Sequence, residues 1–329
     1  MKICILGAGA LGCAIGGVLT EAGHEVWLIN HNVAQVEAMM LRGLILRDGA
    51  GVERTVLVHA ATSPQGVRMG SGAVDLVIVL VKSFHTAQAM QSATALLGPD
   101  TVVMSLQNGL GHEDILADIV GRERVLAGKT YAGGSQLGPG HVLVGTIGKD
   151  THIGELDGRI TGRVQRIADA FNAAGLDTLV SDNIMGTIWD KLLVNVATGA
   201  VSGISRLVYG ELYQVSELEA TGIAAVAEAM AVAKASGVTL SITDPRQPWI
   251  KAGAGLPYDF KTSMLQSLEK GSVTEIDFIN GAVVRQGEKC GVPTPVNQTL
   301  VACIKGIERG LKHLGVPKID GAAKSVPST

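Results

Sequence analysis

Short apolar runs alternate with longer amphipathic stretches through the first half of the chain. The first run covers residues 2–6 and the next covers 24–29, and a glycine-rich turn and a helical stretch near 10–22 separate them. Apolar runs of this length that alternate with helices are typical of strands buried on both faces of a parallel sheet. The pattern predicts a strand–helix–strand unit with a right-handed crossover.

The same alternation continues to about residue 180. We expect further strands at 55–60, 74–81, 101–106, 125–131, 146–153 and 179–180, and helices at 33–42, 85–97 and 162–174. This succession predicts an α/β fold with an N-terminal Rossmann-type doubly wound parallel sheet.

The pattern becomes helical after Asp182. Asp182 and Asn183 are suitable N-cap residues, and helices are expected at 183–202, 211–236, 259–269, 272–289 and 296–313. A chain of 329 residues also exceeds the usual size of a single core. We therefore predict an α/β domain over 1–182 and an all-helical domain over 183–329. The last dozen residues are expected to form a frayed tail.

Composition and charge exclude several classes of protein. The formal net charge is -3 and aromatic residues make up 3% of the chain, which disfavours a nucleic-acid partner. A small anionic substrate remains compatible with this net charge, because its binding needs only one or two local cations. No segment holds eighteen uninterrupted apolar residues, so no membrane span is expected.

The cysteines and the N-terminus bear on localisation. Four cysteines occur without a Cys-x-x-Cys pair, which favours reduced thiols, no metal site and a cytoplasmic protein. Lys2 and the apolar stretch to Leu19 resemble a secretory signal. However, the glycines that interrupt this stretch follow the pattern of a turn motif, which argues against a secretory signal.

That pattern is a glycine-rich turn that matches G-x-G-x-x-G. It lies directly after a predicted strand and opens a predicted helix, which is the context that dinucleotide binding requires. Gly7 permits the tight turn, Gly9 lets a pyrophosphate approach the backbone, and Gly12 lets the helix pack on the sheet. The helix N-terminus attracts the phosphates. The predicted cofactor-binding residues here are Gly7, Ala8, Gly9, Ala10, Leu11 and Gly12. The alternative is a turn without a ligand.

The end of the second predicted strand bears on the choice of cofactor. An acidic residue there binds the ribose of NAD, and a nearby arginine favours NADP. This chain has Asn30-His31-Asn32, with neither. The missing carboxylate removes a repulsion against a 2′-phosphate, and His31 could supply a partial cation. We therefore expect NADP, bound as NADPH, with NAD still possible. His31 as a solvated loop residue stays open.

Four more polar residues lie where a ligand-binding or catalytic site is expected. Lys82 and Asn108 follow predicted strands at their carboxyl ends, where open α/β sheets bind ligands. Lys191 and Asn195 are four residues apart and share a face of a predicted helix. Burying a lysine amine or an asparagine amide in an apolar helix without hydrogen-bond partners costs free energy. The alternatives are that Lys191 reaches solvent and that Asn108 caps a turn before Gly109.

The chain resembles the ketopantoate reductase (2-dehydropantoate 2-reductase) family over nearly its whole length. The resemblance rests on Gly-x-Gly-Ala-Leu-Gly at 7–12, Val-Lys at 81–82, Asn-Gly at 108–109, Lys-x-x-x-Asn at 191–195, Ser-Met-x-Gln at 263–266 and Thr-Glu-Ile-Asp-x-Ile-Asn-Gly at 274–281. It implies NADPH-dependent reduction of a 2-keto acid, ketopantoate, to pantoate on the route to pantothenate. It also implies that the Rossmann domain over 1–182 is the NAD(P)-binding domain, that the helical domain over 183–329 is the substrate-binding and catalytic domain, and that the site lies between them.

The resemblance assigns roles in catalysis and substrate binding. Lys191 would be the general acid, and its charge would stabilise the developing alkoxide. Glu275 would bind the nicotinamide ribose and substrate and orient Lys191. Asn195 and Ser263 would hydrogen-bond the substrate, and Asn108 would touch substrate and cofactor. The alternatives are an ordinary helix residue at Ser263 and a first-turn acid favoured by the helix dipole at Glu275.

It also assigns two cofactor contacts and shows two departures. Lys82 would lie near the adenosine, and Gly134 matches a position where family members offer backbone to the nicotinamide. Many members have asparagines where this chain has Gly199 and Tyr209. Reduction of a different 2-keto acid therefore stays open, as does a non-catalytic NADP(H)-binding regulator. A homodimer is compatible with the sequence but not required by it.

Overall fold

The computed structural model describes residues 1–67, 73–146 and 148–313, so the tail expected at the C-terminus lies outside these ranges. The chain forms two compact units, Met1–Ile188 and Trp189–Thr329. The division falls inside the helix α6 (Ile184–Ser205), a little after the domain boundary predicted at residue 182.

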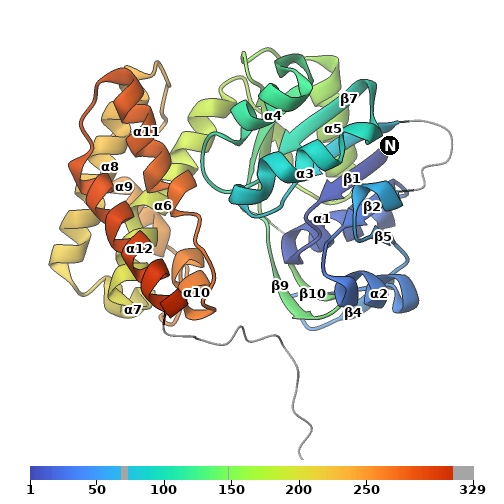
Figure 1. Ribbon diagram of the computed structural model, residues 1–329, viewed down its shortest axis with the longest axis horizontal. Coiled ribbons are helices and arrows are strands. Elements are labelled where there is room, and N and C mark those ends of the chain that lie inside the picture. Colours follow the sequence, from blue (N-terminus) through green and yellow to red (C-terminus); the bar gives the residue numbers. More distant parts are fainter. Residues whose placement is uncertain (68–72, 147, 314–329) are drawn as a thin grey trace, which may run out of the picture. The chain divides into compact units, whose positions relative to one another are not determined.

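The first unit is built on an eight-stranded sheet with the order β12-β11-β8-β7-β6-β1-β2-β5 (Figure 1). Its strands are β1 (Lys2–Leu6), β2 (Glu25–Ile29), β5 (His59–Ala61), β6 (Val74–Val79), β7 (Leu97–Ser105), β8 (Val125–Thr130), β11 (Thr151–Glu155) and β12 (Thr178–Val180). Neighbours are parallel except β8 and β11. The predicted doubly wound sheet is thus confirmed, and its strand order reverses between β1 and β6, where such sheets bind ligands.

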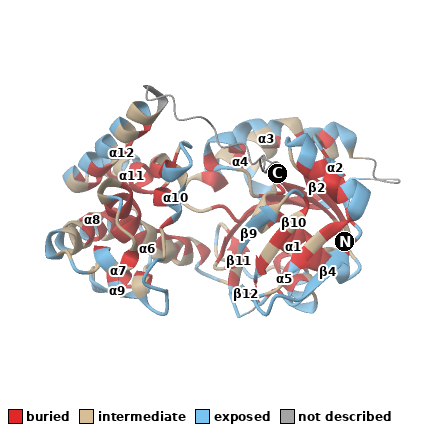
Figure 2. Cartoon of the chain, turned by 90° about the horizontal axis from the view of Figure 1, so that it is seen from below, coloured by how far each residue is buried: buried red, intermediate tan, exposed pale blue. Residues whose placement is uncertain are grey.

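Both faces of this sheet are covered. Ile3 and Ile5 belong to a core that includes residues of α1 (Ala10–Glu21), α2 (Val33–Arg42) and α5 (Gly162–Ala173). Cys4 and Leu6, on the opposite face, belong to a core with residues of α3 (Thr86–Ser92) and α4 (His112–Val120). Burial on both faces is why these strands are uninterrupted apolar runs, and Figure 2 shows the sheet as a mostly buried layer.

A second, four-stranded sheet was not expected from the sequence. Its order is β4-β3-β10-β9, with β3 (Leu44–Arg47), β4 (Glu53–Val56), β9 (Gly133–Gly138) and β10 (His141–Gly145). β9 and β10 contact α1, beside which they lie in Figure 1. The strand predicted at 55–60 is wrong, because β4 and β5 divide this segment between the two sheets. The strand predicted at 146–153 begins only at Thr151.

Several short helical segments complete the first unit. The helix predicted at 85–97 is shorter, because 3-10 turns flank α3 on both sides. α4 was not predicted; it follows a loop in which Gly109 and Gly111 have positive φ angles of 102° and 97°. The 3-10 turns are η1 (Pro64–Gly66), η2 (Ser83–His85), η3 (Thr94–Leu96) and η4 (Arg122–Arg124).

The second unit is helical, as predicted. After α6 come α7 (Tyr209–Leu212), α8 (Ser216–Ala235), α9 (Gln247–Gly253), α10 (Ser263–Glu269), η5 (Ile276–Phe278), α11 (Asn280–Cys290) and α12 (Pro295–His313). The helix predicted at 211–236 is two helices, α7 and α8, and α9 was not predicted. No helix among the described residues is long and apolar enough to cross a membrane.

The helix predicted at 272–289 begins later than expected. Thr274 Oγ1 accepts a hydrogen bond from the Ile276 N–H at 3.2 Å, and a 3-10 turn follows. Ile279 then has φ -109° and ψ -97°, which no helix residue adopts, so α11 starts at Asn280. Glu275 therefore precedes the helix rather than lying in its first turn.

Candidate functional site

The turn between β1 and α1 requires glycine at two of its three glycine positions. Gly7 has φ +102°, and a Cβ there would lie 2.4 Å from the Val81 nitrogen. A Cβ on Gly12 would lie 2.4 Å from the Gly7 carbonyl oxygen. Gly9 differs, because a Cβ there would meet nothing within 4 Å. Packing does not demand glycine at Gly9, and the turn is open to a ligand at this point.

The end of β2 fixes this turn. The Gly7 and Ala8 N–H groups donate to the Ile29 carbonyl oxygen at 3.0 and 2.8 Å. Asn30 Nδ2 donates to the Ala8 carbonyl oxygen at 2.7 Å. Sequence reasoning considered Asn30 only for the choice of cofactor and missed this contact. His31 is exposed.

The N-terminus of α1 suits an anion. Its N-cap, Gly9, provides no side-chain hydrogen bond, and the first turn carries no acidic residue. The N–H groups of a first helical turn lack partners within the helix and attract phosphates. β9 runs past this turn, since a Cβ on Gly134 would lie 2.8 Å from the Ala10 carbonyl oxygen. The residues present therefore fit a dinucleotide pyrophosphate.

Lys82 and Asn108 follow neighbouring parallel strands, β6 and β7, at the same edge of the sheet. Lys82 is exposed and Asn108 is half-buried. Ser83 Oγ donates to the Asn108 carbonyl oxygen at 3.4 Å. The two loops are thus in contact, in the part of the sheet where open α/β folds bind ligands.

Gln107 is a buried residue of these loops that sequence reasoning missed. Its Nε2 donates to the Val81 carbonyl oxygen at 2.7 Å and to Thr86 Oγ1 at 2.9 Å. Its Oε1 accepts from Ser105 Oγ at 3.0 Å. Gln107 therefore fixes the loop that carries Asn108. The available signal was a glutamine directly after a buried apolar strand.

Glu113 is a second buried polar residue that was missed. It lies in the first turn of α4 and is 5% exposed. Burial raises the pKa of its carboxyl group to about 7, although the Gly111 backbone N–H donates to it and favours the charged form. The start of α4 therefore contains a buried carboxyl group whose charged form is disfavoured.

The other site residues lie in the second unit. Lys191 and Asn195 are half-buried and one turn apart on α6. Ser263 is the exposed first residue of α10, whose N-cap Thr262 accepts from the Leu265 N–H at 3.1 Å. Glu275 is half-buried beside η5.

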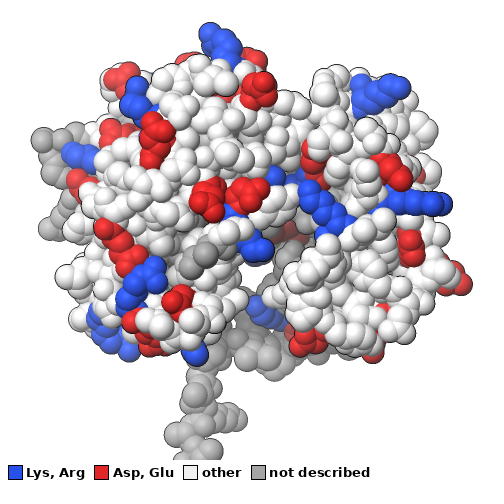
Figure 3. All heavy atoms as spheres, turned by 180° about the vertical axis from the view of Figure 1, so that it is seen from behind, with Lys and Arg blue, Asp and Glu red and all other residues white. Residues whose placement is uncertain are grey.

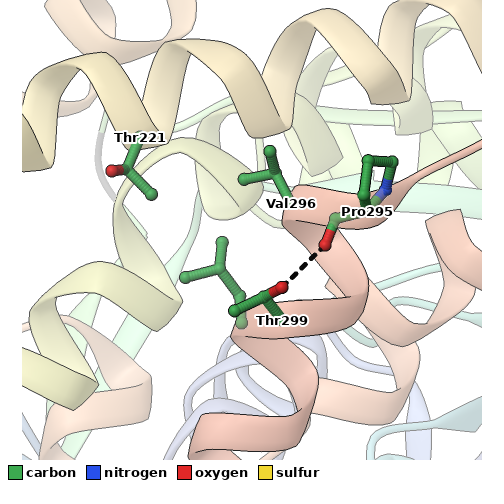
Figure 4. Close-up of a pocket in the computed structure, with 5 residues that line it drawn as sticks. Thr221, Pro295, Val296 and Thr299 are labelled. Carbon is green, nitrogen blue, oxygen red and sulfur yellow. Dashed lines mark hydrogen bonds between the residues drawn. The ribbon is translucent and has the colours of Figure 1, made fainter.

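An apolar hollow of about 250 Å³ lies elsewhere in the second unit. α8 and α12 line it with Thr221, Pro295, Val296, Thr299 and Leu300 (Figure 4). Thr299 Oγ1 donates to the Pro295 carbonyl oxygen at 2.9 Å. The lining carries no cation for an anionic substrate, and none of the predicted site residues belongs to it. The face shown in Figure 3 mixes both signs of charge and shows no broad cationic surface.

A doubly wound sheet whose first strand ends in this glycine turn defines a Rossmann-type dinucleotide-binding protein. The chain belongs to the ketopantoate reductase PanE/ApbA family: the family's N-terminal profile matches residues 3–158 and its C-terminal profile matches 183–308.

Similar proteins match over nearly the whole chain. The 2-dehydropantoate 2-reductase of Archaeoglobus fulgidus is 33% identical over 94% of this chain and 99% of its own. A PanE/ApbA family ketopantoate reductase from Ralstonia eutropha JMP134 is 36% identical, with a TM-score of 0.85 over 95% of this chain and 100% of its own. D-mandelate dehydrogenase with NADH and anilino(oxo)acetate is 29% identical, with the same TM-score and coverages.

Proposed function

We propose that this protein reduces ketopantoate to pantoate with a nicotinamide cofactor, as a step of pantothenate biosynthesis. The observation that carries this proposal is the match to proteins named 2-dehydropantoate 2-reductase, at 33% identity over 94% of this chain. The order of motifs, from the glycine turn to Lys191 and Glu275, supports it. A non-catalytic regulator would not need the lysine.

The first unit binds the cofactor through residues 7–12, with contacts from His31, Lys82, Asn108 and Gly134. The open space at Gly9 and the uncapped N-terminus of α1 support this assignment. A similar protein, D-mandelate dehydrogenase, was solved with NADH. We assign NADPH as the preferred cofactor, because residues 30–32 carry no carboxylate to repel a 2′-phosphate. NADH remains the second choice.

The helical domain, over residues 183–329, binds the substrate and supplies the proton. When bound, the reduced nicotinamide supplies a hydride to the keto carbon. Lys191 donates a proton to the carbonyl oxygen, and its charge stabilises the negative charge that develops there. Asn195 and Ser263 hydrogen-bond the substrate. Glu275 orients Lys191 and contacts the nicotinamide ribose.

The protein acts on a small molecule in the cytoplasm, without nucleic-acid or membrane partners, and a homodimer is compatible with this role. Its four cysteines are all free, which suits a reducing compartment.

The test is oxidation of NADPH, followed by absorbance, with ketopantoate as the substrate and NADH in a parallel assay. Saturable oxidation with both reactants present, and faster turnover of NADPH, is the expected result. Lys289→Ala changes an exposed lysine of the same unit and serves as the control for Lys191→Ala. Tight cofactor binding without turnover of any 2-keto acid would instead favour the regulator.

A further inference from the structure

Two consecutive carbonyl groups fix the backbone around Lys82. The Lys82 carbonyl oxygen accepts from the His85 N–H at 2.8 Å, so this bond closes a turn within the loop itself. The Val81 carbonyl oxygen accepts from Gln107 Nε2 at 2.7 Å. Gln107 follows β7, the neighbour of the strand that leads into this loop. Of these two bonds, the one from Gln107 therefore sets where the loop lies relative to the rest of the sheet.

The peptide group on the other side of Val81 packs against the glycine turn. A Cβ on Gly7 would lie 2.4 Å from the Val81 nitrogen and 2.7 Å from the Leu80 carbonyl oxygen, so the two backbones approach closely. Gln107 thus binds a residue that touches the turn proposed for the pyrophosphate. The same residue leads directly into Lys82, the cation proposed for the adenosine side of the cofactor.

Gln107 uses its whole amide on buried partners. Its Nε2 also donates to Thr86 Oγ1 at 2.9 Å, and this hydroxyl donates to the Ser83 carbonyl oxygen at 2.8 Å. Its Oε1 accepts from Ser105 Oγ at 3.0 Å. Thr86, Ser105 and Gln107 are 0%, 1% and 9% exposed. Buried polar groups cost free energy, and apolar groups of the same shape would fill this space with little loss of stability. Packing therefore does not explain the polar set, whereas the position of the Val81 carbonyl group does.

We infer that Gln107 is a positioning residue for the cofactor and acts through Lys82. This inference rests on the proposed function, in which Lys82 contacts the cofactor. A lysine whose backbone is fixed before the ligand arrives loses less freedom on binding, which increases affinity. Gln107 provides this preorganisation, because it holds the residue before Lys82 against the glycine turn.

Isothermal titration of NADPH into Gln107→Met tests this role. Methionine has about the length of glutamine and lacks its amide, so the Kd should rise about tenfold, the factor that corresponds to one net hydrogen bond. Gln91→Met is the matched control, because Gln91 is exposed on α3, and it should keep the wild-type Kd. A wild-type Kd in folded Gln107→Met overturns the inference.

A double-mutant cycle with Lys82→Ala separates positioning from a purely structural role. Lys82→Ala alone should raise the Kd about tenfold or more, as expected for a hydrogen bond from a charged group. Once the lysine is absent, Gln107→Met should raise the Kd by less than about twofold further, because the two residues act as one unit. A tenfold increase in both backgrounds overturns the inference. So does an unchanged Kd in Lys82→Ala, which removes the contact through which Gln107 acts.

Thr86→Val and Thr86→Ser provide a second test if Gln107→Met does not fold. Thr86→Val removes the hydroxyl that accepts from Gln107 and should raise the Kd about threefold or more. Thr86→Ser restores the hydroxyl and should recover the wild-type Kd, and equal values for the two variants overturn the inference. Assays of turnover separate this result from the proposed function. If NADPH binds in a manner that depends on Gln107 but ketopantoate is not reduced, the inference stands and the proposed reaction fails.

Discussion

Asn30 Nδ2 donates to the Ala8 carbonyl oxygen at 2.7 Å and thereby connects the end of β2 to the glycine turn. The same side chain accepts from the Asn32 N–H at 2.9 Å. One amide therefore fixes both the glycine turn and the loop that carries His31. If the pyrophosphate binds at this turn as proposed, Asn30 affects cofactor affinity through the backbone that it holds in place.

Asn30→Ala should raise the Kd for NADPH about tenfold. The variant loses both hydrogen bonds of Asn30. A net loss of roughly 1.4 kcal/mol, about the contribution of one such bond, corresponds to a factor of ten in Kd. Isothermal titration of the folded variant measures the change. Asn32→Ala is the matched control, since Asn32 caps α2 by accepting from the Gln35 N–H. Loss of this cap should lower the free energy of unfolding by about 1 kcal/mol and have little effect on the affinity for NADPH. An unchanged Kd in Asn30→Ala would remove this role.

Gly9→Val should fold normally and bind NADPH poorly. A Cβ at Gly9 would meet nothing within 4 Å, so the added side chain points into the space assigned to the pyrophosphate. Gly12→Ala is the contrasting variant, because its Cβ would clash with the Gly7 carbonyl oxygen at 2.4 Å. Thermal melting should show a lower Tm for Gly12→Ala only. Wild-type affinity in folded Gly9→Val would exclude the pyrophosphate from this position.

Lys191→Ala should lower kcat by two or more decades. The variant loses both the proton donor and the charge that stabilises the developing alkoxide, and each effect alone contributes about a hundredfold or more. Steady-state kinetics measure the loss, with the exposed Lys289→Ala as the control. Near-normal turnover of Lys191→Ala would assign the proton to another group.

The sequence predicts the large sheet well, because its strands are buried on both faces and are therefore uninterrupted apolar runs. It does not predict β9, whose residues are mostly exposed and whose sequence is polar and glycine-rich. The start of α11 was also misplaced. The positions from 275 to 280 have helical spacing, yet Asn280 is fully buried and its Nδ2 donates to Asn297 Oδ1 at 3.0 Å. A partner so distant in the sequence cannot be inferred from local periodicity.

The candidate site likewise contains residues that the sequence predicts and residues that it does not. The glycine turn follows from its local pattern, because the requirement for glycine arises from the turn itself. Asn30, Gln107 and Glu113 were missed as structural residues of the site. Each acts through contacts or burial that only the folded chain creates, such as the bond from Gln107 Nε2 to the Val81 carbonyl oxygen.

Glu113 should make the stability of the protein depend on pH. Burial raises the pKa of its carboxyl group in the folded state from 4.5 to about 7. Between these values the folded protein retains a proton that the unfolded chain has lost. The folded state is therefore favoured at low pH, and this contribution falls as the pH rises toward 7, by roughly 1.4 kcal/mol for each pKa unit of difference.

Glu113→Gln should remove this dependence, because the amide has nearly the same shape and does not titrate. Relative to the variant, wild-type protein should lose stability as the pH rises from 4.5 to about 7, as measured by denaturant unfolding at each pH. Asp118→Asn is the matched control, since Asp118 is an exposed carboxylate on the same helix and its replacement should leave the wild-type profile unchanged. A constant difference between wild type and Glu113→Gln across this range would show that the folded protein holds Glu113 in the same protonation state as the unfolded chain.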